Sequence, residues 1–363
     1  MIYIPVYNGS HLSYSTGFKE LLFILLILSQ ISCTKKLSPP SSVNTLSKAE
    51  PVNSKATKEA RALLQYIYSI SGKSTLSGQH NYIGQLSRYS DEVNSITGKY
   101  PAIWGSDFGF AGASHDPDNI AYRQKLVEEA KKHYAAGSII TLMWHSCRPQ
   151  DPEPCGWKES VQADLTAQEW EDLVTPGTAM HTAWVQKVDV IASYLKQLQA
   201  ADIPVIWRPY HEMNGGWFWW GQKPGERGYP ALYRMLYNRL VKHHALNNLL
   251  WVWNTDRPRA GIEQYYPGPA YVDILAADIY ENDYNQEYYN RFVQLANGKP
   301  IALGEVGELP TPQLLQQQPQ WSWFMVWSGF LLRKKTPDDI KAVYDLPTVI
   351  NRNNLPEELG KKE

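Results

Sequence analysis

The sequence has few cysteines, almost no net charge and only short apolar runs, and each of these limits what the protein can be. Its three cysteines offer too few ligands for a metal site built on thiolates. Its 35 basic and 36 acidic residues are spread along the chain, so no field attracts a polyanion such as nucleic acid. No internal repeat occurs, which argues against a solenoid or a propeller. A neutral or small ligand is therefore favoured.

Phenylalanine is also scarce, whereas other aromatic residues are abundant. The chain holds 8 Phe against 14 Trp and 23 Tyr. Rings with a polar tip suit a wet binding cleft, although Trp can equally fill a core. Carbohydrate is a ligand that fits such a cleft.

The N-terminal region predicts export. Residues 21–28 (LLFILLIL) are too short to span a bilayer, but they follow Lys19 and precede Cys33, which is the pattern of a signal peptide over residues 1–33. Ser32-Cys33 resembles the lipobox of bacterial lipoproteins, so we expect lipidation at Cys33, with a plain cleaved signal or anchor as the alternative. The lysines after Cys33 favour the periplasmic side of a Gram-negative membrane over the cell surface.

The remaining chain reads as a tether followed by one domain. Residues 34–56 are rich in Ser, Pro, Lys and Asn, which predicts a flexible tether, and one folded domain is expected over 57–363. Cys147 and Cys155 lie in a Pro-rich loop (CRPQDPEPC), where an oxidising compartment permits a disulfide. Two free thiols are the alternative, because spacing does not establish the geometry of a bridge.

Short apolar runs alternate with amphipathic stretches along this domain, which is typical of parallel α/β folds. Helices are expected over 122–136, 181–201, 230–245 and 287–297, where apolar residues recur at helical spacing. Eight strand-and-crossover units predict a closed (β/α)8 TIM barrel. The strands are expected within residues 74–80, 101–109, 138–146, 203–212, 248–255, 273–281, 300–307 and 321–330.

Polar residues gather at the end of each run. Examples are Asp107, His145, Asn254, Asp278 and Glu305. Because the carboxyl ends of parallel barrel strands open on one face, where such enzymes keep their chemistry, these groups are predicted to share one rim.

The densest motif is 207-WRPYHEMNGGWFWWG-221, which carries Glu212. Aromatic surroundings raise a carboxyl pKa, as a general acid requires. The alternative is that Glu212 pairs with Arg208 in a strand-end salt bridge and that the Trp run is core.

A second carboxylate, Glu305, lies in 302-ALGEVG-307. Its flanking glycines are expected to let substrate approach the backbone. Two carboxylates across a barrel mouth can hydrolyse a glycosidic bond, one as acid and the other as nucleophile or base. Spacing in sequence does not choose between these two geometries.

These two motifs, with WH at 144–145, WVWN at 251–254 and DIY at 278–280, resemble glycoside hydrolase family 26, most of whose members are β-mannanases. The resemblance covers the chain after the tether. It implies a retaining endo-β-1,4-mannanase with Glu212 as acid/base and Glu305 as nucleophile, no metal or organic cofactor, β-mannan or manno-oligosaccharides as substrate, and a monomer. The substrate-binding residues it implies are His145, Trp157, Arg208, His211, Trp217, Asp278, Tyr280 and Trp327. Among them, Arg208 is expected to support Glu305 by charge and hydrogen bonding, Tyr280 to donate a hydrogen bond to Glu305, and Asp278 to support Tyr280 or reach a sugar hydroxyl.

Several of these contacts have a structural alternative. His145 can be satisfied by neighbours at its strand end, Asp278 can form a structural hydrogen bond, and Trp157 or Trp327 can be packing residues. The chain also departs from the family pattern in 327-WSG-329, where members often carry an Arg after the Trp. Ser328 in its place is expected to weaken a distal subsite.

Three other functions stay open. An end-acting enzyme that releases mannobiose, or a β-1,3-xylanase or mixed-linkage β-glucanase of the same family, would keep the same catalytic pair. A non-catalytic glycan-binding lipoprotein is disfavoured, because a binding protein has no need of a paired acid and nucleophile.

Overall fold

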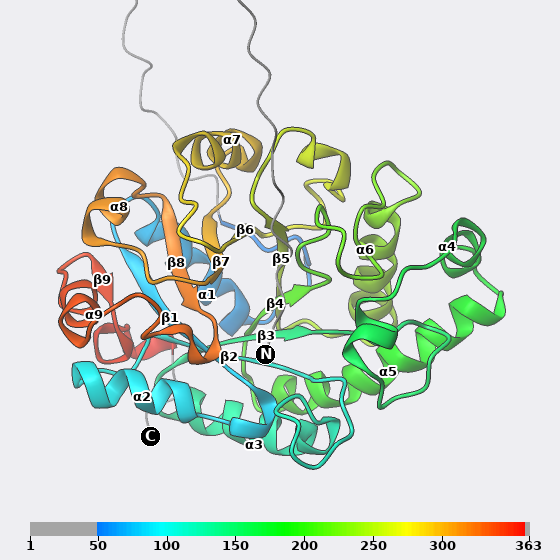
Figure 1. The fold of residues 1–363 in the computed structure, drawn as a ribbon, viewed down its shortest axis with the longest axis horizontal. Helices are drawn as coiled ribbons and strands as arrows, with labels where there is room; N and C mark the ends of the chain where they lie inside the picture. Colours follow the sequence, from blue (N-terminus) through cyan, green and yellow to red (C-terminus); the bar gives the residue numbers. More distant parts are fainter. Residues whose placement is uncertain (1–48, 360–363) are drawn as a thin grey trace, which may run out of the picture. The chain divides into compact units, whose positions relative to one another are not determined.

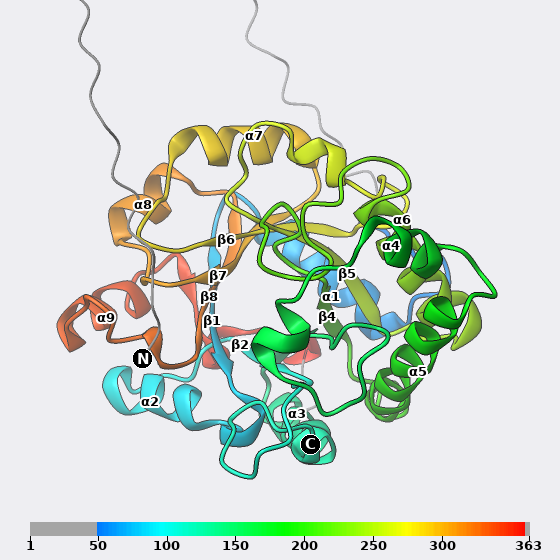
Figure 2. The same ribbon diagram turned by 45° about the vertical axis from the view of Figure 1, so that its right-hand side comes forward.

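The computed structural model describes residues 49–359, and its centre is a closed ring of eight parallel strands (Figures 1 and 2). Each strand pairs in parallel with the next, and β1 pairs with both β2 and β8, which closes the barrel. The predicted TIM barrel is confirmed. The strands are β1 (Thr75–Asn81), β2 (Ile103–Asp107), β3 (Ile139–Trp144), β4 (Val205–Pro209), β5 (Leu249–Asp256), β6 (Ile274–Ile279), β7 (Ile301–Val306) and β8 (Trp321–Val326), and a two-residue β9 (Val349–Ile350) pairs with the start of β1.

The helices surround the barrel and mostly start at a capping residue. Among residues 49–359, six α-helices begin after a Thr or Asn whose side chain accepts a hydrogen bond from a first-turn N–H group, which satisfies a free backbone donor. The helix expected over 230–245 is divided into α6 and a π-helix (Asn238–His243). The α-helices are α1 (Lys58–Ile70), α2 (Arg88–Thr97), α3 (Arg123–Ala135), α4 (Ala167–Val174), α5 (Ala179–Gln199), α6 (Tyr229–Tyr237), α7 (Gln286–Ala296), α8 (Pro312–Gln317) and α9 (Pro337–Tyr344).

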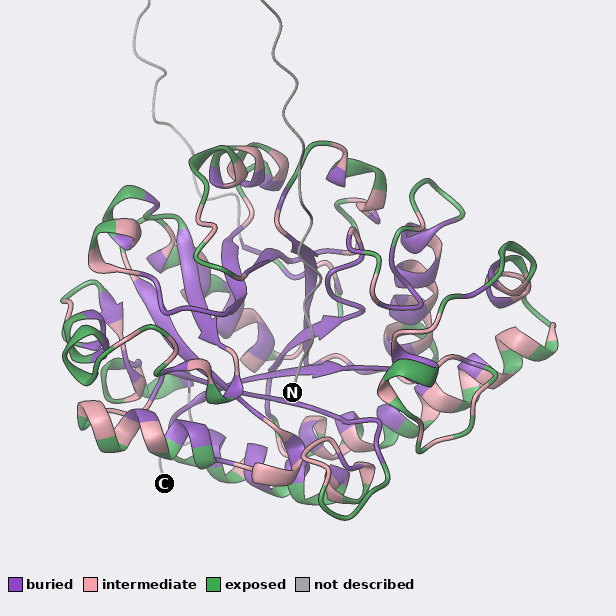
Figure 3. Cartoon of the chain, in the orientation of Figure 1, coloured by how far each residue is buried: buried purple, intermediate pink, exposed green. Residues whose placement is uncertain are grey.

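Burial separates the strands from the outer faces of the helices. All residues of β1 to β8 are buried, whereas the helices expose one side to solvent (Figure 3). Helix α1 packs Leu63 and Ile67 against residues near the beginnings of the strands, such as Ile103 and Ile274. It therefore covers the amino ends of the strands, and the carboxyl ends remain available for a site.

Residues 49–56 belong to the folded domain, although they were expected in the tether. The Val52 amide donates to Asp273 at 2.7 Å, and the Asn53 side chain donates to Asn247 at 2.9 Å. The domain therefore starts before Thr57. The expected signal peptide, Cys33 and the rest of the tether lie outside the described residues. Within residues 49–359, no helix has the length and apolar character needed to cross a membrane.

Candidate active site

A cavity of about 350 Å³ opens at the carboxyl ends of the strands and contains both predicted catalytic carboxylates. Glu212 follows β4, and Glu305 is near the end of β7. The barrel topology thus brings together two residues that are 93 positions apart in the chain, as their places at the ends of two strands predict. The lining consists of His145, Trp157, His211, Glu212, Trp217, Phe218, Asp256, Arg257, Tyr280, Glu281, Glu305 and Trp327.

Glu305 is held by hydrogen bonds on both carboxylate oxygens. The Arg208 Nη2 group donates to Oε1 at 3.0 Å, and the Tyr280 hydroxyl donates to Oε2 at 2.7 Å. Burial and the Glu305 charge raise the pKa of Tyr280 well above its usual value, so its hydroxyl stays a donor. A buried guanidinium and a hydroxyl both stabilise the ionised carboxylate, the form that a nucleophile needs.

Arg208 belongs to the support of Glu305 and does not pair with Glu212. It lies outside the cavity lining, and its guanidinium also donates to Asn254 Oδ1 at 2.8 Å and to Asp278 Oδ1 at 3.3 Å. The salt bridge weighed as an alternative role for Glu212 is therefore absent, since Arg208 pairs with Glu305 and Asp278.

Two expectations around Glu305 are corrected by this packing. Asp278 is fully buried behind Arg208 and does not line the cavity, so it does not reach a sugar hydroxyl there. A Cβ at Gly304 would lie 2.0 Å from Asn254 Oδ1 and 2.7 Å from Asp278 Oδ1. The space beside this glycine is thus filled by protein side chains and not by substrate.

Glu212 has a strained backbone and an aromatic hydrogen-bond donor. Its φ is 56°, and its amide donates to the Asn254 carbonyl at 2.8 Å. The Trp217 indole N–H donates to Glu212 Oε2 at 2.6 Å. Burial, with the charges of Glu305 and Asp256, raises the pKa of Glu212 well above its usual value. Glu212 therefore tends to hold a proton while Glu305 stays paired with Arg208, which is the division between a general acid and a nucleophile.

Two histidines complete one wall of the cavity. His145 Nδ1 lies 2.9 Å from Asp107 Oδ2, and burial alone would lower its pKa, but the Asp107 charge and hydrogen bond raise it. The ring of His211 lies 4.7 Å from that of His145, edge to face. Burial and the charges of His145 and Arg208 lower the pKa of His211 well below its usual value, so it is neutral. Its Nε2 atom lies 3.9 Å from Glu305 Oε1.

Aromatic rings form the rest of the wall. Trp157, Trp217 and Trp327 all line the cavity, which places these predicted residues where a sugar ring could stack. Trp327 lies flat on His80, with ring centres 4.0 Å apart. Ser328 is fully buried, and its hydroxyl lies 3.1 Å from His80 Nδ1, so this residue faces His80 and not the cavity.

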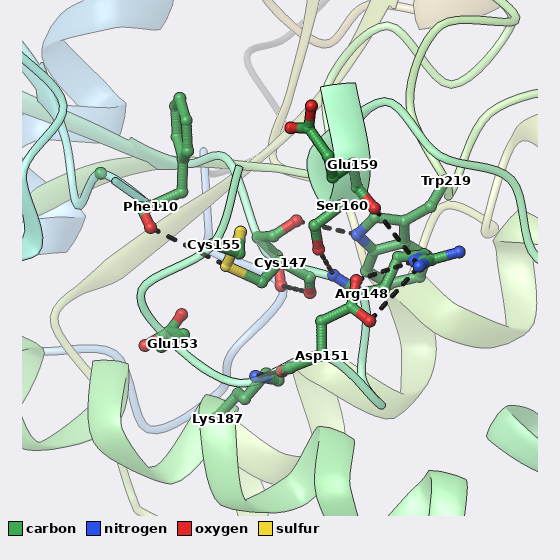
Figure 4. Close-up of a disulfide and its surroundings, with 12 residues drawn as sticks. Phe110, Cys147, Arg148, Asp151, Glu153, Cys155, Glu159, Ser160, Lys187 and Trp219 are labelled. Atoms are coloured by element: carbon green, nitrogen blue, oxygen red, sulfur yellow. Dashed lines mark hydrogen bonds and ion pairs between the residues drawn. A yellow bond between two sulfur atoms is a disulfide. The ribbon is translucent and has the colours of Figure 1, made fainter. Parts of the chain in front are cut away.

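The disulfide loop supports the Trp157 wall. Cys147 and Cys155 are bonded, and the Cys155 amide donates to the Phe110 carbonyl at 2.8 Å (Figure 4). Arg148 closes the loop through an ion pair with Asp151 at 2.8 Å. Because Trp157 follows Cys155 by two residues, the bridge restrains the segment that carries this ring.

A metal ion has no clear place in this cluster. Donor atoms of His211, Asp278 and Glu305 lie within 4.8 Å of one another. Both carboxylates, however, already accept hydrogen bonds from the Arg208 guanidinium, whose positive charge opposes a cation there.

Four lining residues were not predicted: Phe218, Asp256, Arg257 and Glu281. Phe218 lies inside the aromatic run after Glu212. Asp256 is the last residue of β5, two positions after the WVWN segment, and Arg257 follows it, so their place at a strand end was the signal that could have identified them.

A (β/α)8 barrel with two buried carboxylates in one aromatic cavity defines the class of barrel glycosidases. The model of glycosyl hydrolase family 26 matches residues 52–354. The chain belongs to this family.

Relatives and solved structures agree with this assignment. The chain is 37% identical over 316 residues to a mannan endo-1,4-beta-mannosidase of Thermothelomyces thermophilus, which covers 84% of this chain and 62% of the relative. It is 32% identical to mannan endo-1,4-beta-mannosidase A of Piromyces sp, covering 88% of this chain and 53% of that protein. It thus spans between half and two thirds of the length of these two relatives. The solved structure of GH26A from Muricauda sp. MAR_2010_75 is 46% identical, covers 84% of this chain and 99% of that chain, and has a TM-score of 0.80.

Proposed function

We propose that the protein is a retaining endo-β-1,4-mannanase in which Glu305 is the nucleophile and Glu212 the acid/base. The observation that carries the proposal is the unequal environment of the two carboxylates in one cavity. Glu305 accepts hydrogen bonds from Arg208 and Tyr280, whereas burial and neighbouring charges raise the pKa of Glu212. The mannan substrate is supported by the family and by the activity for which the Thermothelomyces thermophilus and Piromyces relatives are named.

The reaction follows from these environments in two displacements. In the first, a Glu305 oxygen bonds to the anomeric carbon while the glycosidic bond breaks, and Glu212 gives its proton to the leaving oxygen. Glu305 is now an ester and its charge is gone, so Glu212 loses a repulsive neighbour and its pKa falls. In the second, Glu212 takes a proton from water, which attacks the anomeric carbon and releases Glu305. The second inversion restores the original configuration.

Neighbouring residues assist these steps through position and charge. Tyr280 and Arg208 orient Glu305 before attack, and their hydrogen bonds favour the charged form of its carboxylate. Neutral His211 lies beside Glu305 without adding a second cation that would lower its nucleophilicity. Trp157, Trp217 and Trp327 offer faces for sugar rings.

A time course of products tests the activity. Residues 49–363 are incubated with linear β-1,4-mannan, β-1,3-xylan and mixed-linkage β-glucan, with Glu305→Ala as the inactive control. Early manno-oligosaccharides of mixed length are the expected result. Release of mannobiose alone from the start would show that the enzyme acts from a chain end and not internally. Activity only on another glycan would contradict the assignment of mannan as the substrate.

We also propose that the protein is exported, lipidated at Cys33 and held as a monomer on the periplasmic side of a Gram-negative membrane. The proposal is supported by the apolar run at 21–28 and the Ser32-Cys33 pair. The full chain is produced in a bacterial host, and mass spectrometry of its mature N-terminus is expected to find a diacylated Cys33. Light scattering of residues 49–363 in solution without detergent is expected to give the mass of a monomer. An unmodified N-terminus elsewhere would exclude lipidation.

A further inference from the structure

Asn254 connects the supports of the two catalytic carboxylates. It lies near the carboxyl end of β5 and is fully buried, outside the lining of the catalytic cavity. Its backbone carbonyl accepts a hydrogen bond from the Glu212 amide at 2.8 Å, and its side-chain Oδ1 accepts one from Arg208 Nε, also at 2.8 Å. Arg208 in turn donates to Glu305. One residue of β5 thus contacts both the backbone of the acid and the guanidinium that holds the nucleophile.

The direction of the Arg208 guanidinium depends on this contact. The group is planar and rigid, so a hydrogen bond that fixes Nε also sets the direction in which Nη2 points. The Nη2 atom lies 3.0 Å from Glu305 Oε1 and 3.3 Å from Asp278 Oδ1. A small rotation of the guanidinium would therefore shift this donor from the nucleophile to Asp278. The Nη1 atom lies 3.9 Å from the Met143 sulfur, a weak acceptor that opposes such a rotation little.

The Asn254 side chain is itself held by close packing. A Cβ at Gly304, the residue before Glu305, would lie 2.0 Å from Asn254 Oδ1, so the acceptor oxygen rests on the backbone of β7. The other end of the amide, Nδ2, donates to the Thr255 carbonyl at 3.3 Å. Asn254 therefore presents a fixed acceptor to Arg208.

We propose that Asn254 is a positioning residue that keeps the Arg208 guanidinium directed at the nucleophile. Its Oδ1 atom fixes Nε, and the rigid guanidinium then places Nη2 against Glu305 Oε1. Because the Asn254 carbonyl also holds the Glu212 amide, the same residue fixes this arrangement relative to the acid. The inference rests on the proposed glycosidase function and adds to it a residue that acts through Arg208 from outside the cavity.

The variant Asn254→Ala tests this role, because it removes the acceptor and leaves the backbone carbonyl that holds Glu212. The matched control is Asn248→Ala, which removes another fully buried asparagine side chain directly before β5. The Asn248 side chain donates to the Ile203 carbonyl at 2.8 Å, at the amino end of the strand. Both variants are made in the full chain, and urea unfolding shows that each is folded. Asn254→Ser, which keeps a shorter hydroxyl group, takes the place of the alanine variant if that protein does not fold.

Two substrates separate an effect on the nucleophile from an effect on the acid. The leaving group of 2,4-dinitrophenyl β-mannobioside needs no proton, so kcat/KM on this substrate reports the attack by Glu305, whereas linear mannohexaose also needs the proton of Glu212. Asn254→Ala is expected to lower kcat/KM on both substrates by a similar factor, about tenfold or more, because a misplaced nucleophile slows attack whatever the leaving group.

Binding and the control are expected to change little. The inhibition constant of mannobiose should stay within about twofold in Asn254→Ala, since this residue lies outside the cavity lining. Asn248→Ala should lower the urea midpoint but keep kcat/KM within about twofold, because its contacts are at the other end of the strand.

Four outcomes would overturn the proposal. They are an unchanged kcat/KM in the folded Asn254 variant, a loss confined to mannohexaose, a weaker inhibition by mannobiose that accounts for the whole loss, and an equal loss of kcat/KM in Asn248→Ala. The second of these would assign the effect to the acid and not to the nucleophile. Wild-type protein inactive on both substrates would instead refute the proposed function itself.

Discussion

The hydrogen bond from Trp217 to Glu212 predicts a specific change in the pH dependence of activity. In Trp217→Phe an aromatic ring remains, but the N–H group that donates to Glu212 Oε2 at 2.6 Å is lost. This donor stabilises the ionised carboxylate and so lowers the pKa of Glu212 against the opposing effect of burial. Its removal must therefore raise that pKa further.

The magnitude follows from the charge on the acceptor. A hydrogen bond to a charged group contributes about 1.5–3 kcal/mol, and one pKa unit corresponds to about 1.4 kcal/mol. Loss of the full hydrogen bond would thus raise the pKa of Glu212 by about one to two units. Water in the open cavity can replace part of the lost hydrogen bond, so we expect a rise of about one unit. Because the protonated acid is the active form, activity is lost as pH rises through the Glu212 pKa. The alkaline limb of kcat/KM should move to higher pH by about one unit.

The assay is the pH profile of kcat/KM on linear manno-oligosaccharides for wild type, Trp217→Phe and Trp157→Phe. Trp157 lines the same cavity but is not a hydrogen-bond partner of Glu212, so its variant controls for the loss of an indole surface. An alkaline limb that stays in place or moves to lower pH in Trp217→Phe would refute the reasoning, whatever the change in the maximal rate.

Three further predictions concern the supports of the site. Tyr280→Phe removes the 2.7 Å hydrogen bond to Glu305 and should lower kcat about 10–100-fold with little change in KM; steady-state kinetics showing an unaltered kcat would exclude this role. Arg208→Ala leaves buried Glu305 unpaired and should lower the free energy of unfolding in urea by about 3–5 kcal/mol, a result contradicted by an unchanged midpoint. Replacing Cys147 and Cys155 by Ser removes a crosslink of sequence separation 8 and should cost about 2.5 kcal/mol in the same assay, whereas equal stability of the variant and the oxidised wild type would argue against the bridge.

The barrel and its catalytic face could be predicted from the sequence because both depend on local patterns. Each strand is a short apolar run with a polar residue at its carboxyl end. Because the strands are parallel, these carboxyl ends all lie on one face of the barrel. Glu212 and Glu305 could be placed on this rim without any coordinates. The prediction of one helix over 230–245 was less exact, because the change to a π-helix at Asn238 depends on packing rather than on apolar spacing.

The contacts within the site were harder to predict because they depend on side-chain direction across neighbouring strands. Asp278 lies near the end of its strand, as Glu305 does. Its side chain, however, accepts a hydrogen bond from Arg208, is fully buried and does not line the cavity. Gly304 was expected to admit substrate, but its free space is used by Asn254 and Asp278. Residues 49–56 have the composition of a tether and are nevertheless bound to the barrel through Asp273 and Asn247. Composition does not show which polar groups form hydrogen bonds with residues far along the chain.

The most direct test of the catalytic assignment is to trap the glycosyl-enzyme. Glu212→Ala should form this ester from 2,4-dinitrophenyl β-mannobioside, whose leaving group needs no proton, and should hydrolyse it slowly because the base for the second step is missing. Mass spectrometry of the quenched and digested protein is predicted to find the added mannobiosyl mass on the peptide that contains Glu305. Attachment at another residue, or rapid turnover with no covalent species, would contradict the account.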